Sequence, residues 1–292
     1  MRYLDAAATR ASLGMGDAIA AMERAFGDDR EVPVRVLLGP SLFMPGRVGS
    51  DTGVKVVSTV PGHPAGIVAV FDDSGSCRGL VDGPTLTAIR TAAGAGLATR
   101  LLARPDAAVL AMLGAGAMAH DQVVAVMEVR PIRQVLVWSR NRDRAQALAE
   151  RVGGRAVTEA DAAVAEADVV SSATPSRRAL FDPGMLRPGT HVNAVGAFTP
   201  EMVEIPAAVV AQARVFVDDI AAAAAEAGDL LQAGRHPDGT IADLLTARIR
   251  GRTTSEQITL FKSVGIASQD VAAAAAALDR AESDGLGVEV GT

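Results

Sequence analysis

The chain has 292 residues, of which 49% are apolar, and its 34 acidic and 28 basic side chains leave a formal net charge of −6. This composition supports a large core in one or two domains, and it excludes the basic footprint expected for binding nucleic acid or an anionic membrane. A single cysteine, Cys77, excludes an intrachain disulfide and a four-thiolate zinc site, and no apolar run reaches the roughly 18 residues of a membrane span. We therefore expect a cytoplasmic protein without a metal centre that acts on a small molecule.

The N-terminal part of the chain is predicted to combine one long helix with short strands. Leu4, Leu13, Ile19, Met22 and Phe26 recur at helical spacing, which favours a helix over residues 1–30. Stretches rich in β-branched residues, bounded by proline and glycine, then indicate three strands, over residues 32–38, 53–60 and 66–71.

A second helix is predicted to begin at Asp82-Gly83-Pro84. Asp82 or Gly83 would cap it, and Pro84 would occupy the first helical position, where a missing N–H costs nothing. Apolar residues continue the helical spacing to Leu101, and Pro105 ends the helix.

Beyond Pro105 the pattern changes to short apolar strands that alternate with helix-length segments. The predicted strands are residues 107–113, 134–139, 168–173, 191–195 and 214–217, and alanine-rich helices are predicted over residues 221–231 and 266–280. Strands of this kind are typical of a parallel sheet that helices cover on both faces. The predicted fold class is α/β, with a Rossmann-type doubly wound parallel sheet over residues 104–261 and a discontinuous α+β domain over residues 1–103 and 262–292.

A GxGxxA motif lies directly between a predicted strand and a predicted helix, in the run Gly114-Ala-Gly116-Ala117-Met118-Ala119. Gly114 would allow the tight turn, Gly116 would let backbone amides approach a pyrophosphate, and Ala119 would permit close helix packing. The motif therefore predicts a dinucleotide site, and the alternative is a structural glycine-rich turn in an unrelated sheet.

The end of the second predicted strand lacks the acidic residue that usually binds the adenosine ribose of NAD. The sequence there is Ser139-Arg140-Asn141-Arg142, whose hydroxyl, amide and guanidinium groups suit a 2′-phosphate. We therefore expect NADPH as the cofactor, with NADH also possible. The alternative is that both arginines are solvated residues at the start of the next helix.

Only two of the 28 basic residues are lysines, Lys55 and Lys262. Where a guanidinium would serve, the chain uses arginine, so both lysines are candidates for positions that need an ammonium able to give up a proton. Chance retention is the alternative, and it weighs more for Lys262.

Five motifs, met in order along the chain, resemble those of the ornithine cyclodeaminase/mu-crystallin family. They are Gly53-Val-Lys55-Val-Val-Ser58, Asp82-Gly-Pro-Thr-Leu-Thr-Ala-Ile-Arg90-Thr-Ala-Ala, the GAGAMA turn, His191-Val-Asn-Ala-Val-Gly-Ala197 and Thr259-Leu-Phe-Lys262-Ser-Val-Gly265. The resemblance covers about residues 30–285. It implies a homodimer whose N-terminal segment and last helix form a substrate-binding and dimerisation domain beside the nucleotide domain.

The resemblance also implies roles for individual residues. Arg35 matches the arginine that binds the substrate carboxylate, Lys55 matches the active-site lysine, and Arg90 matches an arginine at the cofactor phosphates and the active site. The remaining residues expected to contact the cofactor are Thr91, Thr174, Val195, Lys262 and Ser263.

These assignments agree with the chemistry of reducing an imine next to a carboxylate. A guanidinium at Arg35 would orient the carboxylate, and Lys55 could supply a proton because burial and a neighbouring cation lower a lysine pKa. Without the resemblance, both would read as exposed ends of strands. His63 lies in the predicted loop Pro61-Gly62-His63-Pro64 and could face the nicotinamide or the substrate, although a loop histidine is more often solvated.

One residue departs from the cyclodeaminase and alanine-dehydrogenase members of the family. They carry an aspartate directly after the motif that reads Val195-Gly196-Ala197 here, whereas this chain has Phe198. A phenylalanine cannot handle protons during loss of ammonia, but it could line a pocket for an aliphatic ring. Asp218 and Asp219 follow a predicted strand and are expected to cap the next helix.

The sequence therefore predicts an NAD(P)H-dependent reductase of cyclic or linear imino acids, such as Δ1-pyrroline-2-carboxylate or Δ1-piperideine-2-carboxylate. One alternative is another enzyme of this fold: an ornithine cyclodeaminase, an alanine or other amino-acid dehydrogenase, or a synthase that joins amino and keto acids. A second alternative is a mu-crystallin-like protein that binds NADPH and small ligands without significant catalysis.

Overall fold

The computed structural model describes residues 1–27, 29–60 and 65–291. The chain divides into two compact units, unit 1 formed by Met1–Gly94 with Ile266–Thr292, and unit 2 formed by Ala95–Gly265. Both predicted boundaries, at residues 103 and 262, fall within unit 2. The first division lies inside helix α3 (Gly83–Leu102), where no change in the hydrophobic pattern marks it.

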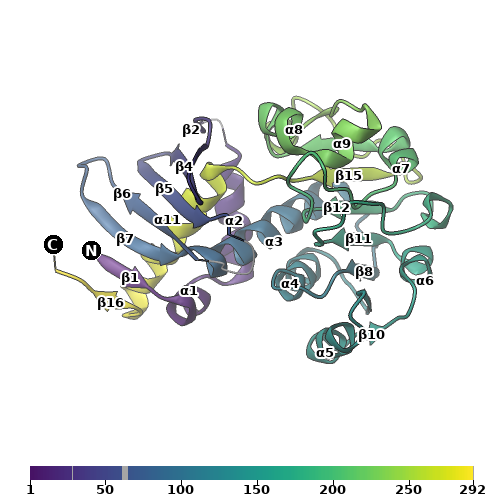
Figure 1. Cartoon of the computed structure of the whole chain (residues 1–292), viewed down its shortest axis with the longest axis horizontal. Helices are drawn as coiled ribbons and strands as arrows, with labels where there is room; N and C mark the ends of the chain where they lie inside the picture. The colour runs from purple at the N-terminus through teal and green to yellow at the C-terminus, as the bar shows by residue number, and fades with distance from the viewer. Residues whose placement is uncertain (28, 61–64, 292) are drawn as a thin grey trace. The chain divides into compact units, whose positions relative to one another are not determined.

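Unit 1 is built on a mainly antiparallel sheet, shown on the left of Figure 1. Its strands run in the order β16 (Val288–Glu289), β1 (Arg2–Leu4), β7 (Cys77–Asp82), β6 (Gly66–Phe71), β5 (Asp51–Ser58), β4 (Ser41–Val48) and β2 (Arg30–Glu31), and β3 (Val36–Leu38) also pairs with β4. The helices of the unit are α1 (Ala6–Ser12), α2 (Met15–Ala25), the first part of α3, and α11 (Ala267–Asp284). Helix α11 packs on β4, β5, β6 and β7, and α2 packs on α11.

Two glycines of the sheet let α11 lie directly on the strands. A Cβ at Gly53 would come within 3.0 Å of Val271 Cγ2, and one at Gly79 within 2.5 Å of Leu278 Cδ2. Because the side chain of a larger residue would push the helix away, these glycines bring α11 close enough for its polar first turn to reach β5.

The predictions for unit 1 need three corrections. The helix expected over residues 1–30 is a strand and two helices, because Asp5 caps α1 and the chain is extended at Leu13 and Gly14. The strand expected over residues 32–38 is reduced to the three residues of β3, and β2 lies just before the predicted range. Strands β4 and β7 were not predicted, and Pro45 and Gly46 conceal β4 by interrupting its pattern.

Pro45 is tolerated in β4 because of where the neighbouring strands end. On the side away from β5, β3 pairs with Ser41–Phe43 and β2 pairs with Arg47 and Val48. Pro45 therefore faces neither strand there, and its missing N–H leaves no acceptor unpaired.

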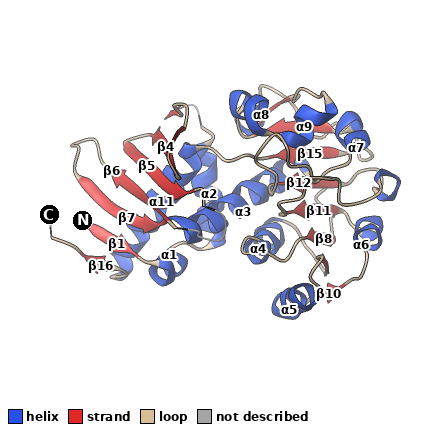
Figure 2. Ribbon diagram, in the orientation of Figure 1, coloured by secondary structure: helices blue, strands red, loops and turns tan. Residues whose placement is uncertain are grey.

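Unit 2 contains the predicted parallel sheet, whose helices flank it on both faces in Figure 2. The strand order is β10 (Arg155–Ala156), β9 (Gln134–Trp138), β8 (Val109–Leu113), β11 (Val169–Ser172), β12 (His191–Ala194), β15 (Thr259–Lys262), β13 (Arg214–Val217) and β14 (Gly239–Thr240). The helices are α4 (Ala119–Val129), α5 (Arg142–Val152), α6 (Ala160–Glu166), α7 (Ala207–Gln212), α8 (Ile220–Glu226), α9 (Gly228–Ala233) and α10 (Ile241–Leu245), with a short 3₁₀ turn at Pro183–Met185.

The side chains of alternate residues of β8 pack in separate apolar cores on the two faces of this sheet. Leu110 and Met112 pack in one apolar cluster, while Ala111 and Leu113 pack in the other. The doubly wound α/β prediction is therefore confirmed. The strand order reverses between β8 and β11, and in open α/β sheets such a switch point is where ligands bind.

Two further details of unit 2 differ from the predictions. The helix expected over residues 221–231 is two helices, α8 and α9, which meet at Ala227. The break is fixed by Gly228, where a Cβ would lie 2.1 Å from the carbonyl oxygen of Met202. Strands β10, β14 and β15 were not predicted as strands. Within residues 1–27, 29–60 and 65–291, no helix is long and apolar enough to cross a membrane.

Candidate functional site

The glycine turn of unit 2 has the geometry that a dinucleotide requires. Gly114 has a φ of +117°, and a Cβ there would come within 2.8 Å of the carbonyl oxygen of Ala173. At Gly116, by contrast, a Cβ would meet nothing within 4 Å. The protein itself therefore demands glycine at position 114, whereas the open space at Gly116 is suited to the close approach of a ligand.

A cavity of about 450 Å³ opens at the carboxyl ends of β8, β9 and β11. Residues from all three strand ends line it, including Gly114 and Gly116, Ser139 and Arg140, and Thr174. Helix α4 begins directly after the glycine turn, so its N-terminus presents backbone N–H groups there. The cavity, the turn and the helix dipole together fit the pyrophosphate and adenosine portions of a nicotinamide dinucleotide.

The segment after β9 supplies hydrogen bonds and positive charge to the same cavity. Asn141 Oδ1 accepts a hydrogen bond from the backbone N–H of Arg144 at 2.9 Å. This oxygen therefore caps α5 within the protein. Arg140 and Arg144 line the cavity, whereas Arg142, predicted to contact the cofactor, is not among its lining residues. Arg144, in the first turn of α5, was missed.

Arg178 was also missed as a cavity residue. It lies on the loop after β11, together with Pro175 and Ser176, and it lines the cavity that Arg140 and Arg144 approach from β9 and α5. No sequence motif marked this arginine, because its position depends on how the loop folds beside the switch point.

A buried carboxylate joins the ends of β11 and β12 beside this cavity. Glu204 Oε1 accepts from the Thr174 amide at 2.7 Å, and Oε2 accepts from the amides of Gly196 and Ala197 at 2.8 and 3.0 Å. Burial raises the pKa of Glu204, and the nearby Lys262 ammonium opposes that shift. The residue therefore fixes the backbone that forms the cavity wall.

Lys262 is part of the same network and is fully buried. Its ammonium lies 2.8 Å from Asp229 Oδ2 and donates to the carbonyl oxygen of Ala197. Asp229 Oδ1 accepts in turn from the amides of Glu204 and Ile205. The structure thus gives Lys262 an ion-pair partner inside unit 2, and its contact with the cofactor stays a prediction.

Other predicted cofactor residues near these strand ends are similarly enclosed. Ser263 is 3% exposed, and its hydroxyl donates to Asp218 Oδ2 at 2.9 Å, while Val195 is also buried. Asp218 does not cap the next helix, because its carboxylate holds the turn after β15 through the amides of Val264 and Gly265. Asp219 caps α8, as expected.

The lysine and arginine motifs of unit 1 meet at one buried aspartate. Lys55 Nζ from β5 lies 3.2 Å from Asp270 Oδ1, and Arg90 Nε from α3 lies 2.9 Å from the same oxygen. Lys55 also donates to Thr87 Oγ1 at 2.6 Å, and Arg90 donates to Gln269 Oε1 at 3.2 Å. Neither Asp270 nor Gln269 was predicted, because both read as ordinary polar residues in the first turn of an alanine-rich helix.

The electrostatic surroundings of Lys55 suit proton transfer near neutral pH. Burial lowers the pKa of Lys55 to about 8, with Asp270 opposing the shift and the positive charges of Arg90 and Arg35 adding to it. An ammonium with such a pKa holds a proton at neutral pH and can still release it.

The remaining predicted site residues lie in unit 1 or outside the described chain. Arg35 is partly exposed just before β3, and its charge acts on Lys55. Thr91 is buried next to Arg90 in α3. His63 lies outside the described residues. Phe198, in unit 2, is 52% exposed.

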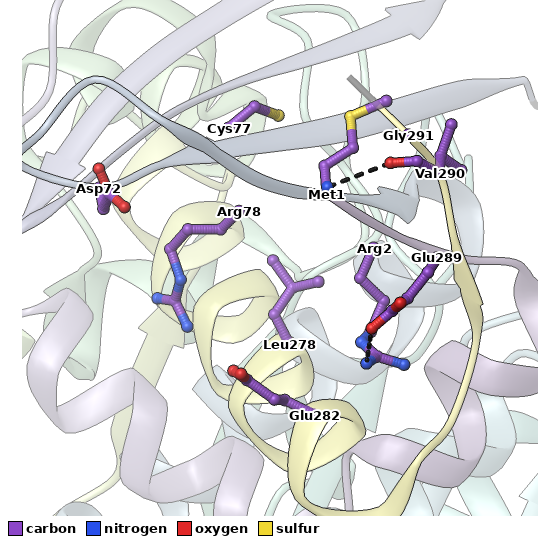
Figure 3. A pocket seen from close by; sticks show the side chains of 10 residues that line it. All are labelled: Met1, Arg2, Asp72, Cys77, Arg78, Leu278, Glu282, Glu289, Val290 and Gly291. Carbon is purple, nitrogen blue, oxygen red and sulfur yellow. Dashed lines mark hydrogen bonds and ion pairs between the residues drawn. The ribbon is translucent and has the colours of Figure 1, made fainter.

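A second cavity, of about 540 Å³, lies beside the chain termini in unit 1 (Figure 3). Arg2 and Glu289 form an ion pair in its wall at 3.3 Å, and the Met1 amine donates to the carbonyl oxygen of Val290. Arg78 pairs with Asp51 and Asp279. The arginines of this wall are thus neutralised within the protein, and Cys77 is the one thiol there.

A model of the ornithine cyclodeaminase/mu-crystallin family matches residues 31–285 of the chain. A Bacillus cereus protein named Δ1-pyrroline-2-carboxylate reductase is 34% identical over 260 residues, which cover 82% of this chain and 80% of that protein.

Solved structures show the same fold across the whole chain. Δ1-Pyrroline-2-carboxylate reductase of Thermococcus litoralis, in complex with NADH and L-proline, matches with a TM-score of 0.93 and 30% identity, covering 99% of this chain and 100% of that one. An archaeal alanine dehydrogenase dimer with bound NAD matches with a TM-score of 0.92 and 26% identity, covering 100% and 99%.

Proposed function

Because the chain belongs to the ornithine cyclodeaminase/mu-crystallin family, we propose that it is an NAD(P)H-dependent reductase of small imino acids, such as Δ1-pyrroline-2-carboxylate or Δ1-piperideine-2-carboxylate. The observation that carries this proposal is the buried Lys55, held with Arg90 on Asp270, in a chain whose 34% identical relative is named for that reduction. The product is the corresponding amino acid.

Two charged residues of unit 1, Arg35 and Lys55, have different roles in the reaction. Arg35 binds the carboxylate of the imino acid, since a guanidinium fork matches a carboxylate with two parallel hydrogen bonds. The reduced nicotinamide, when bound, supplies a hydride to the imine carbon. Lys55 gives its proton to the imine nitrogen, which takes up the C=N π electron pair, and water then reprotonates the neutral amine of Lys55.

The cofactor is NADPH in preference to NADH. Arg140, Arg144 and Arg178 line the cavity, and the four residues directly after β9, residues 139–142, include no acidic side chain to bind the two ribose hydroxyls of NADH. Guanidinium groups favour a 2′-phosphate through charge-assisted hydrogen bonds. NADH use at higher concentration is compatible with the same cavity, and the Thermococcus litoralis relative was solved with NADH.

Phe198 argues against cyclodeamination as the main activity. Loss of ammonia from an oxidised diamino acid needs a proton acceptor at that position, and a phenylalanine has no titratable group.

The working form is a homodimer formed through the open face of the unit 1 sheet. Because Lys55 and Gly53 face α11, the alternate residues of β5 face away from it. Val36, Phe43, Val56 and Ile67 form one cross-strand apolar row on that open face, and Val36 and Ile67 are exposed. A second copy would cover this row, in line with the dimeric alanine dehydrogenase of the same fold.

The test of the proposed function is oxidation of NADPH, followed at 340 nm, by the purified protein with each of the two cyclic imines. L-Ornithine with NAD is the parallel reaction. Rapid imine-dependent oxidation without proline formation from ornithine supports the reductase. Proline and ammonia from ornithine would replace it with a cyclodeaminase, and NADPH binding with no turnover of either substrate would replace it with a ligand-binding protein.

A further inference from the structure

Asp270 is a buried carboxylate that bridges two buried cationic side chains. It lies in the first turn of α11, and a single oxygen, Oδ1, contacts both Lys55 Nζ and Arg90 Nε. All three side chains are at least nine-tenths buried. Glycines of the sheet that face α11, among them Gly46 and Gly53, let this turn lie close enough to β5 for the contact to form.

We propose that Asp270 is a positioning residue for the reduction: it holds the Lys55 ammonium beside the Arg90 guanidinium and keeps Lys55 protonated at neutral pH. This proposal rests on the proposed function, since it gives Asp270 its role through the proton that Lys55 donates. Asp270 itself contacts the two cations and is not the proton donor.

The balance of charge around Lys55 supports this role. The charged groups that act on Lys55 are Asp270 from α11, Arg90 from α3 and Arg35 from the segment before β3, so one anion faces two neighbouring cations. Thr87, from α3, contributes a neutral hydroxyl. Without Asp270, burial and two guanidinium charges would act together to remove the proton from Lys55.

The hydrogen bonding of Asp270 also differs from that of the structural carboxylates in unit 2. Glu204 accepts through both oxygens from backbone amides, and Asp218 accepts two amides and a hydroxyl on one oxygen. Within the described residues, Asp270 Oδ1 accepts hydrogen bonds from two cationic side chains, and its buried Oδ2 has no hydrogen-bond partner. Its carboxylate therefore organises charged side chains and contributes nothing to holding a backbone turn.

The direct test is a titration of Lys55 by NMR in the full-length protein. The chain has only two lysines, so protein labelled with ¹³C at the lysine side chains gives two sets of signals, and Lys55→Met identifies which belongs to Lys55. The wild-type signal should titrate near pH 8. In Asp270→Asn the midpoint should fall by about one unit or more, because the stabilising anion is gone.

The kinetic counterpart is the pH profile of kcat/KM for the imine. Asp270→Asn should lower kcat about fivefold at pH 8, because a fall of about one unit in the Lys55 pKa reduces its protonated fraction from about a half to about a tenth. The imine KM should change much less, and the deficit in kcat should narrow towards pH 6, where Lys55 is largely protonated in both proteins. Asp279→Asn, a control on the same helix whose partner is Arg78, should leave the profile unchanged. Asp270→Glu, which restores the negative charge, should restore kcat/KM on the alkaline side of the pH profile.

Each outcome decides the proposal. A Lys55 midpoint that does not move in Asp270→Asn, or a loss of kcat that is equal at every pH, would assign Asp270 a purely structural role. If Asp270→Asn does not fold, the smaller Asp270→Ser serves the same comparison. If the wild-type protein reduces no imine, the proposed function fails while the NMR titration still reports whether Asp270 controls Lys55.

Discussion

The carboxylate of Glu204 receives two hydrogen bonds from Thr174, one from the amide nitrogen at 2.7 Å and one from the hydroxyl at 3.0 Å. Thr174 follows β11 and lines the cavity at the switch point. A fully buried side chain in unit 2 thus fixes the backbone against which a dinucleotide would lie, and Lys262 and Asp229 complete the network behind it.

Replacing Glu204 with glutamine should destabilise unit 2 and weaken cofactor binding. Glutamine has the same shape, but its NH2 group would face either the Thr174 amide or the amides of Gly196 and Ala197, which leaves buried donors unpaired. The expected loss of unfolding free energy is about 1–3 kcal/mol. Urea denaturation and an NADPH titration measure the two effects, and unchanged values in both would refute the role assigned to this network.

The pKa of Lys55 predicts how the activity depends on pH. The proposed proton donor is the Lys55 ammonium, so the imine reaction should be fastest below the Lys55 pKa and should decline as the pH rises through about 8. Lys55→Met should lower kcat at least about a hundredfold, because it removes the proton donor, while NADPH binding in unit 2 is preserved. A wild-type rate that stays constant from pH 7 to pH 10 would contradict the proton-donor role.

Arg35→Ala should act mainly on substrate binding. Removing the guanidinium takes away a charge-assisted contact to the carboxylate, so the KM for the imine should rise about tenfold or more with a smaller change in kcat. Arg35→Lys keeps the charge without the planar fork and should fall between the wild type and the alanine variant. Steady-state kinetics at saturating NADPH separate the two parameters, and an unaltered KM in Arg35→Ala would exclude the assignment.

The parallel sheet and its nucleotide turn could be predicted because their signals are local. The strand, turn and helix around Gly114 are consecutive in the sequence, and each carries its own periodicity or glycine requirement. The resemblance also brought Lys55 and Arg90 forward as site residues. Asp270 could not be found in this way, because its role depends on contacts 215 residues away with Lys55 and 180 residues away with Arg90.

The sequence motif could not predict which of Arg142 and Arg144 lines the cavity. Both are charged, exposed and at the start of α5, and the sequence favoured Arg142 because it stands closer to the strand. Helical geometry separates the two, since successive residues of a helix point about 100° apart and Arg142 and Arg144 in α5 therefore point about 200° apart. The cavity is lined by Arg144 and not by Arg142.

This difference gives a test of cofactor preference. Arg144→Ser should raise the KM for NADPH about tenfold, because one charge-assisted contact to the 2′-phosphate is lost, and it should leave the KM for NADH nearly unchanged. Arg142→Ser should change either value less than about twofold. Arg178→Ser is expected to resemble Arg144→Ser. Equal effects of Arg142→Ser and Arg144→Ser on NADPH would mean that nonspecific charge, and not the cavity lining, sets the preference.

The open face of the unit 1 sheet predicts the oligomeric state. Its apolar row across β3, β4, β5 and β6 is costly to leave in water, and a second copy of the chain would bury it. Light scattering should therefore give twice the 29.9 kDa chain mass. Ile67→Glu places a charge at the β6 end of the row and should shift the protein towards the monomer, because burying an unpaired carboxylate is unfavourable.

Asp72→Lys is the matched control for this experiment. Asp72 lies in the turn after β6, in the wall of the cavity near the termini and away from the apolar row, so the change alters charge without touching the proposed interface. The Asp72→Lys protein should remain dimeric at concentrations where Ile67→Glu dissociates. A wild-type protein that is monomeric at micromolar concentration would exclude this face as a stable homodimer interface.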